Sequence, residues 1–191
     1  NTILFNSNPV GHMTPNARRA LGVLAAPEER LGHAAAPDMD LIENSMLTAM
    51  VRKNLSNAGF LNWQRAKAFA QTIIDEFDVR TPGPQSIARS LSGGNLQKYV
   101  IGREVLQDPD VLIVNQPTWG VDAAAAAAIR QSLLDLASKG AAIIVISQDL
   151  DELMEISTRF SALNNGKLSV AQTMAKFSLD EIGLLLGGAD A

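Results

Sequence analysis

The chain has 191 residues, 47% of them hydrophobic and 19% charged, which is enough apolar material for one folded domain, or one domain with an insert. Its net charge of −4 argues against a broad basic face that binds a nucleic-acid backbone. The sequence has no cysteine and only two histidines, which excludes disulfides, thiolate metal sites and a histidine-rich metal site.

The first 36 residues predict short elements separated by turns. Residues 2–5 are expected to form a strand, and residues 21–26 a second strand that ends before a proline. Between them, Thr14 and Pro15 suit the cap and first position of a helix. Because the chain begins with Asn1, without a methionine or a basic leader, we expect it to be a fragment of a longer protein.

The middle of the chain predicts helices without strands between them. In residues 40–55 and again in residues 62–77, apolar side chains recur at intervals of three and four residues, the pattern of amphipathic helices. Two successive helices of this kind predict a helical insert that spans residues 37–107.

The last third alternates between apolar strands and helices. The apolar runs at 111–114 and 141–146 are separated by a predicted helix at 123–137, an order typical of a parallel sheet with both faces covered. The neighbouring runs predict a helix at 149–156, a strand at 159–163, a hairpin turn at 164–167 and a helix at 178–186. No apolar run approaches the roughly 20 residues of a membrane-spanning helix. The sequence therefore predicts an α/β fold whose core comes from residues 1–36 and 108–191.

Ser92, Gly93 and Gly94 form the first candidate site. Ser92 is placed to cap a helix whose first turn has no side chains, so its backbone N–H groups are open to a phosphate. The alternative is that these residues are only a turn before a helix.

Polar residues follow both apolar strands, and ligands of α/β sheets bind at such strand ends. The first strand leads into Asn115 and Gln116, then Trp119, which is suited either to stack on a base or to pack on the surface. The second strand leads into Gln148 and an acidic segment at 149–155. These acidic residues suit a cation site or, more simply, the first turns of a helix, whose dipole favours negative charge.

Together these motifs resemble an ATP-binding cassette of an ABC transporter. The resemblance rests on 91–94 (Leu-Ser-Gly-Gly), 117–118 (Pro-Thr), 120–122 (Gly-Val-Asp) and 147–152, which occur in the family's order and spacing. It is nearest to the second cassette of the tandem-cassette ATPases that drive simple-sugar or nucleoside importers. It implies a P-loop NTPase-like fold with a parallel-sheet core and a helical signature subdomain at 37–107.

The same resemblance implies the ligands and partners. ATP and Mg²⁺ would be the cofactors, and a second cassette and transmembrane permease subunits the direct partners, with a periplasmic-type solute-binding protein involved indirectly and no nucleic acid. The chain would be a peripheral subunit at the cytoplasmic face of a bacterial inner membrane.

The departures from the family pattern concern the cassette's own nucleotide site. The Gly-x-x-x-x-Gly-Lys-Ser/Thr loop is absent from the sequence and is expected upstream of Asn1. The Mg²⁺-holding Asp falls on Asn115, the catalytic carboxylate on Gln116, the switch His on Gln148 and the lid Gln on Glu28. An amide brings no charge to a hard cation and cannot accept a proton from water. The sequence therefore predicts a degenerate site without a metal and without an intact catalytic residue.

The residues that this family uses across a dimer interface are present. Ser92, Gly93, Gly94 and Asn95 match the signature, and Asp122 matches the residue that crosses the interface beside it. The hypothesis is that this chain completes a partner cassette's ATP site and is inactive alone. Because the strand before the phosphate loop would be missing, the fragment is expected to fold around a gap, recruit another segment or associate with a neighbour.

Two other functions stay open. One is a catalytically silent cassette with a structural or regulatory role, and the other is a soluble ABC ATPase outside transport. A dinucleotide-binding oxidoreductase fits poorly, because no Gly-x-Gly-x-x-Gly follows a strand.

Overall fold

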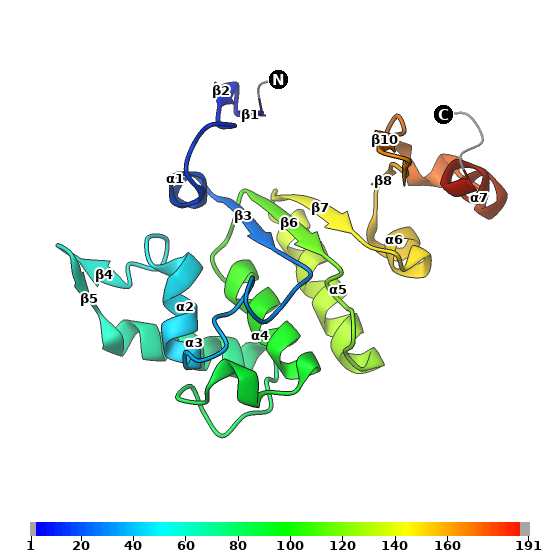
Figure 1. The fold of residues 1–191 in the computed structure, drawn as a ribbon. Coiled ribbons are helices and arrows are strands. Elements are labelled where there is room, and N and C mark those ends of the chain that lie inside the picture. The colour runs from blue at the N-terminus through cyan, green and yellow to red at the C-terminus, as the bar shows by residue number, and fades with distance from the viewer. Residues whose placement is uncertain (1–2, 188–191) are drawn as a thin grey trace. The chain divides into compact units, whose positions relative to one another are not determined.

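The computed structural model describes residues 3–187 and has two compact units, Asn1–Ile146 (unit 1) and Ser147–Ala191 (unit 2) (Figure 1). Unit 1 contains a parallel sheet and most of the helices, and unit 2 consists of short elements around a small core of its own. Among the described residues, no helix combines the length and the hydrophobicity that crossing a bilayer requires.

The sheet of unit 1 has three parallel strands in the order β3 (Val23–Ala26), β6 (Val111–Asn115) and β7 (Ala142–Ile146). The central strand β6 pairs Val111 with Val23 on one side and with Ala142 on the other. All three strands therefore end at the same edge, where the polar residues after β6 emerge. The predicted α/β fold with a parallel sheet is confirmed.

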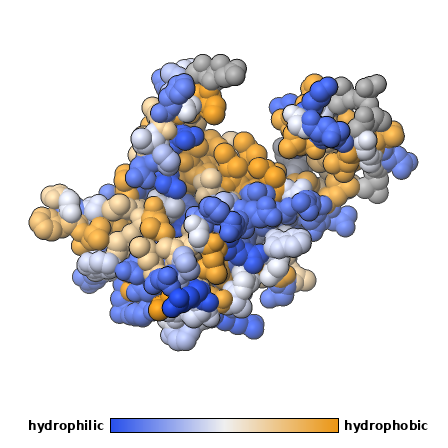
Figure 2. All heavy atoms as spheres, in the orientation of Figure 1, coloured by the Kyte–Doolittle hydropathy of each residue, from blue (hydrophilic) through white to orange (hydrophobic). Residues whose placement is uncertain are grey.

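The strand β7 is less covered than its sequence predicts. Ile144 and Ile146 are each 51% exposed, and no strand among residues 3–187 pairs with the edge of β7 that faces away from β6. Figure 2 shows hydrophobic surface over this part of the sheet. Since parallel strands are normally buried on both faces, the expectation of a fully covered sheet is wrong for β7 within the described residues.

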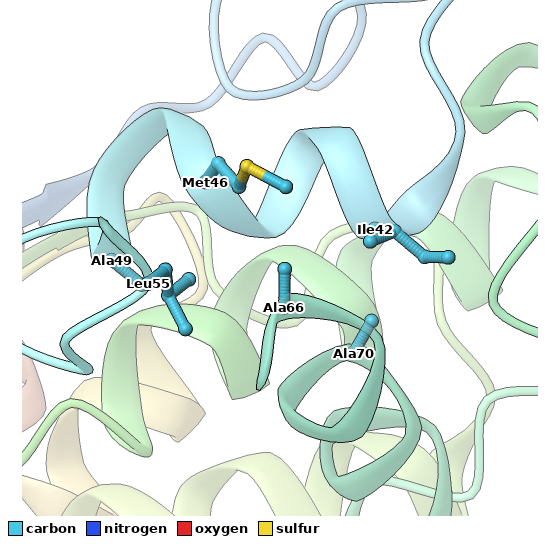
Figure 3. Close-up of a cluster of buried hydrophobic side chains, with 6 residues drawn as sticks. All are labelled: Ile42, Met46, Ala49, Leu55, Ala66 and Ala70. Atoms are coloured by element: carbon cyan, nitrogen blue, oxygen red, sulfur yellow. The ribbon is translucent and has the colours of Figure 1, made fainter. Parts of the chain in front are cut away.

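In the helical part of unit 1, two helices pack against each other and against the turn that joins them. The capping box of Asp40 and Glu43 fixes the start of α2 (Leu41–Ala49), in which each side chain accepts from the other residue's backbone N–H. Asn62 caps α3 (Trp63–Glu76). Apolar side chains fill the space between the helices (Figure 3): Ile42, Met46, Ala49, Leu55, Ala66 and Ala70.

Between these helices lies a hairpin that the sequence pattern does not predict. Its strands β4 (Ser56–Asn57) and β5 (Phe60–Leu61) are two residues long and joined by a two-residue turn. Phe60 at the start of β5 is 80% exposed. The helix predicted for residues 40–55 is correspondingly shorter, because α2 ends at Ala49.

The helix α4 (Gly93–Val105) is the centre of unit 1. It packs against α2, α3, α5 (Ala123–Ser138) and the strand β3, and every residue from Leu96 to Glu104 is buried. Arg103 is 1% exposed and donates to the carbonyls of Ala34 and Asn44 as well as to Glu104. The helix α4 therefore contacts both the sheet and the helical segment. The division into a core (1–36 and 108–191) and a signature subdomain (37–107) remains a prediction.

The remaining elements are short. In unit 1 these are β1 (Leu4–Phe5), β2 (Asn8–Pro9), α1 (Pro15–Ala20) and the 3₁₀ turn η1 (Ala88–Ser90). Unit 2 contains α6 (Leu150–Ile156), β8 (Arg159–Phe160), β9 (Leu163–Asn164), β10 (Lys167–Leu168), β11 (Gln172–Thr173), η2 (Met174–Lys176) and α7 (Leu179–Gly187). The predicted helix starts at Thr14, Asp149 and Ser178 agree with the side-chain caps of the structure.

Replacing Gly102 by alanine tests the close packing of α4. A Cβ at this position would lie 2.6 Å from Cδ2 of Phe77 and 3.0 Å from Cγ2 of Ile73. The cost of overpacking, about 1–3 kcal/mol, outweighs the gain in helix propensity of about 1 kcal/mol. Urea unfolding should therefore show a lower free energy of unfolding for Gly102→Ala.

The matched control is Gly183→Ala in α7, where no atom lies within 4 Å of the added Cβ. This variant should lose no stability. A Gly102→Ala protein as stable as the unchanged chain would contradict the packing described for α4.

Candidate functional site: the exposed start of helix α4

The corner at residues 92–95 carries the exposed N-terminus of an otherwise buried helix. Ser92 has an extended backbone and caps α4, with its hydroxyl oxygen accepting from the Asn95 backbone N–H. The Asn95 side chain donates to the same oxygen at 2.9 Å and accepts from the Arg80 backbone N–H, also at 2.9 Å. Ser92 and Gly93 are exposed and Gly94 is half-buried. The first turn of α4 thus presents its amides and the positive end of the helix dipole at the surface.

The two glycines have close neighbours that would have to shift to admit side chains. A Cβ on Gly93 would lie 2.8 Å from an Nη1 atom of Arg30, and a Cβ on Gly94 would lie 3.3 Å from the carbonyl oxygen of Gly120. Glycine at these positions therefore does more than leave space for a ligand. It also allows Arg30 and the loop after β6 to approach the helix.

The loop after β6 reaches the same corner. Asn115 is the last residue of β6, and Gln116 turns the chain with a left-handed φ of 52°, a conformation that non-glycine residues adopt at a cost. Asp122 then caps α5 by accepting from the Ala125 N–H at 2.9 Å. That hydrogen bond lowers the pKa of the Asp122 carboxyl, with smaller contributions from Lys98 and Arg80. The Asp122 carboxylate is therefore charged at neutral pH.

A small cleft of about 190 Å³ joins these parts. It brings together four of the five residues predicted to act in trans, namely Ser92, Gly94, Asn95 and Asp122, while Gly93 lies beside it on the exposed turn. Arg80 and Lys98 also line the cleft, and Lys98 is held by the carbonyl and carboxylate of Asp78. The helix amides and Arg80 favour an anion in this cleft, whereas the Asp122 carboxylate opposes one and Lys98 is already paired with Asp78.

A buried polar network around Gln97 holds α4 and the loop after β6 together behind residues 92–95. The Gln97 side chain is 2% exposed and donates to the carbonyls of Pro117 at 2.8 Å and Gln116 at 3.2 Å. Its oxygen accepts from Nε of Arg30 at 2.8 Å. Sequence reasoning assigned no role to Gln97, and it placed Arg30 only within the segment 23–30, which is similar to the part of such cassettes that contacts the transmembrane partner. The available signal was a glutamine on the helix face that also carries Val100 and Ile101.

The strand-end residues do not make a Mg²⁺ site. Asn115 and Gln116 carry amides, and Gln116 is buried, whereas Mg²⁺ sites in proteins are usually built with carboxylates. Within residues 3–187, no group of three histidine or acidic side chains is arranged to hold a metal ion. The residues present therefore do not fit a magnesium centre of this chain's own, and no catalytic step is derived through one.

The other two predicted positions are exposed. Glu28 lies in the loop after β3, two residues before Arg30. Gln148 belongs to unit 2 and precedes Asp149, which caps α6 by accepting from the Glu152 N–H. Ser147 also donates to Glu152, so two residues of the acidic segment, Asp149 and Glu152, form hydrogen bonds at the start of this helix. Trp119, proposed to stack or pack, is 63% exposed.

The chain is similar to known proteins in both its structure and its sequence. No protein-family model matches the chain. Its structure superposes with a TM-score of 0.70 on the dimeric ATP-binding cassette MJ0796 bound to ADP and phosphate, at 17% identity over 89% of this chain and 72% of that one. The fold is that of an ATP-binding cassette.

Curated proteins of similar sequence indicate which ATP-binding cassettes this chain resembles. The guanosine import ATP-binding protein NupO of Bacillus subtilis is 34% identical over 98% of this chain and 37% of its own length. The galactose/methyl galactoside import ATP-binding protein MglA of Salmonella typhimurium is 35% identical over 88% of this chain and 33% of its own length. The chain belongs to the ABC transporter ATP-binding proteins and resembles those of nucleoside and sugar importers. It spans about a third of the length of these relatives.

Replacing Gln97 by methionine tests the buried network. Methionine has a similar volume but cannot pair with the carbonyls of Gln116 and Pro117 or with Arg30. The Gln116 carbonyl still accepts from the Trp119 N–H, but the Pro117 carbonyl loses its donor. An unpaired buried polar group costs about 1–3 kcal/mol, so Gln97→Met should lower the free energy of unfolding by about this amount. The control is Gln131→Met on exposed α5, where the change should stay within about 0.5 kcal/mol. Equal effects of both variants would argue against the network.

Proposed function

We propose that this chain is part of an ATP-binding cassette of a nucleoside or sugar importer and that it completes the ATP site of a partner cassette. The exposed start of α4, with four of the five predicted residues around one cleft, is the observation that carries the proposal. The dimeric state of MJ0796 supports a second cassette as the partner, and the relatives' names support the importer class.

In this proposal the partner's ATP supplies the terminal phosphate that is to be transferred to water. The free N–H groups at the start of α4 hold that phosphate, because they have no intrahelical acceptor and lie at the positive end of the helix dipole. Ser92 orients the turn through its cap, and Arg80 lowers the energy of negative charge in the cleft. Positioning and electrostatics of this kind provide most of the catalysis of phosphoryl transfer.

The residues at the ends of this chain's own strands lack a carboxylate that could activate water. The Gln116 amide cannot take a proton from an attacking water, and general-base catalysis typically contributes roughly 10²–10⁴ in rate. The chain alone is therefore proposed to be inactive, and the assembled transporter to be an ATPase with non-equivalent sites. Permease subunits would anchor it at the cytoplasmic face of the membrane, and a solute-binding protein would act indirectly through them.

Ser92 gives the sharpest test of the proposed role. Ser92→Asp keeps the helix cap, since aspartate caps as well as serine does, but places a negative charge where the phosphate would bind. The ATPase rate of the chain assembled with its partner cassette should fall by about 100-fold, comparable to the loss of one transition-state hydrogen-bond donor.

Ser92→Thr is the matched control, because it keeps both the cap and the neutral charge, and it should retain most of the rate. An unchanged ATPase rate for Ser92→Asp would contradict the proposal. ATP-independent association of the chain with the partner cassette, at a constant rate of hydrolysis, would favour the silent structural cassette.

The degenerate site predicts a second result. Titration calorimetry of this chain with MgATP should give no binding at micromolar concentrations, because Asn115 and Gln116 offer no carboxylate to the cation. The Gln116→Glu variant should not restore binding, since one carboxylate does not supply the missing phosphate loop. Micromolar affinity of the unchanged chain would contradict the proposal that its own site is degenerate.

A further inference from the structure

The hairpin β4–β5 and the start of α3 carry large apolar side chains at the surface of unit 1. Phe60 is 80% exposed, Leu61 is 44% exposed, and Trp63, the first residue of α3, is 53% exposed. Figure 1 shows the hairpin extending beyond the helices α2 and α3, and Figure 2 shows hydrophobic residues on this part of the molecule. These side chains therefore lie on a projection of unit 1.

The segment around the hairpin is basic, although the chain as a whole is acidic. Residues 44–74 contain no acidic residue and four basic ones: Arg52, Lys53, Arg65 and Lys67. This segment has a charge of +4, so the rest of the chain has a charge of −8 to reach the total of −4. A positive segment with exposed apolar side chains, set in an acidic chain, favours an anionic partner at this place.

Two of the four cations are available to such a partner. The other two bind within unit 1, since Arg52 donates to the Asp108 carbonyl at 2.6 Å and Nζ of Lys53 lies 3.5 Å from the Asp108 carboxylate. Arg65 and Lys67 are exposed, and no carboxylate among residues 3–187 forms an ion pair with either of them. Their charges are therefore not neutralised within the described part of the chain.

The free cations lie close to the apolar side chains. Trp63 and Lys67 are four positions apart on α3, so they share one face of the helix. Arg65 is in the same first turn and donates to the Asn54 carbonyl, just before the hairpin, at 3.4 Å. Apolar and aromatic side chains next to lysine and arginine suit a membrane surface, where the apolar groups enter the acyl boundary and the cations meet the headgroups.

We propose that the hairpin β4–β5 and the start of α3 form a docking surface for an anionic lipid bilayer. Phe60 and Trp63 enter the boundary between headgroups and acyl chains, and Arg65 and Lys67 lie among the anionic headgroups. A surface this small binds reversibly, because stable anchoring takes more than one weak membrane signal. This inference goes beyond the proposed nucleotide site and does not depend on it.

The hairpin β9–β10 of unit 2 provides a comparison within the same chain. Leu163 and Leu168 are 68% and 70% exposed, and Lys167 lies beside them in the sequence. Unit 2, however, has seven acidic and three basic residues in its sequence. Its net negative charge opposes an anionic bilayer, so variants in β10 can serve as matched controls.

Partition of the chain onto vesicles at low salt tests the proposal. Vesicles of phosphatidylglycerol and phosphatidylcholine in equal amounts should bind the chain roughly 20-fold more strongly than phosphatidylcholine alone, since each of two cations contributes about five-fold. Lys67→Gln should therefore lower the partition coefficient on the anionic vesicles about five-fold. Phe60→Ser should lower it about ten-fold, because it removes an apolar ring from the acyl boundary.

Lys167→Gln and Leu168→Ser in β10 are the controls, because they remove the same kinds of group from exposed positions. Both should leave the partition coefficient unchanged. Equal coefficients for Phe60→Ser and Leu168→Ser, or equal binding of the unchanged chain to neutral and anionic vesicles, would overturn the proposal. The thermal midpoint of each variant should stay constant, since all four side chains are exposed.

Trp63 gives a second measurement on the same surface. The chain has two tryptophans, so Trp119→Phe leaves Trp63 as the sole one. With anionic vesicles its emission should shift to shorter wavelength, and lipids brominated near the headgroup should quench it. Unchanged emission of vesicle-bound protein would overturn the proposal. So would Phe60→Ser if it weakened association with the partner cassette but not with vesicles, because the surface would then be a protein contact.

Discussion

The structure of unit 1 depends on the burial of α4 along most of its length with its first turn left at the surface. The buried stretch from Leu96 to Glu104 packs against helices on one side and the sheet on the other. Hydrogen bonds fix the helix at both ends, through Gln97 near its start and Arg103 near its end. Because the rest of the helix is held in this way, its first turn presents the amides at Gly93 and Gly94 at the surface.

A nucleotide site needs one set of groups to hold phosphate and another to bind Mg²⁺ and activate water. The described residues of this chain provide the first set and not the second. Holding a phosphate needs backbone amides and positive charge, which α4 and Arg80 provide. Binding Mg²⁺ and activating water need carboxylates at the strand ends, where this chain has Asn115 and Gln116. This difference is the basis of the proposal that the chain serves another cassette's nucleotide rather than its own.

Local signals in the sequence predicted the helix starts, because a capping side chain acts within three or four residues. Thr14, Ser92 and Asp149 are examples. The end of α2 was predicted less well. Leu55 lies in the turn beyond the helix but fills the same core as Met46, so the apolar periodicity continues after the helix has ended.

Contacts between distant residues could not be predicted in this way. Arg30 and Gln97 are 67 positions apart, and nothing in either neighbourhood specifies the other. The β4–β5 hairpin was missed because strands of two residues leave no alternation to detect, although Ala58 and Gly59 both adopt the positive φ of a tight hairpin turn. The exposure of Ile144 and Ile146 depends on which elements cover their face of the sheet, and an apolar run such as 142–146 carries no information on that.

Amide chemical shifts would show whether the start of α4 contacts a nucleotide held by the partner cassette. In ¹⁵N-labelled chain, the N–H signals of Gly93 and Gly94 should shift when the partner cassette is added with a non-hydrolysable ATP analogue, and should stay in place with either component alone. Movement of these two signals only when both are present is the predicted result. Signals that remain unchanged in the complete mixture, while the two cassettes are bound to each other, would contradict the account.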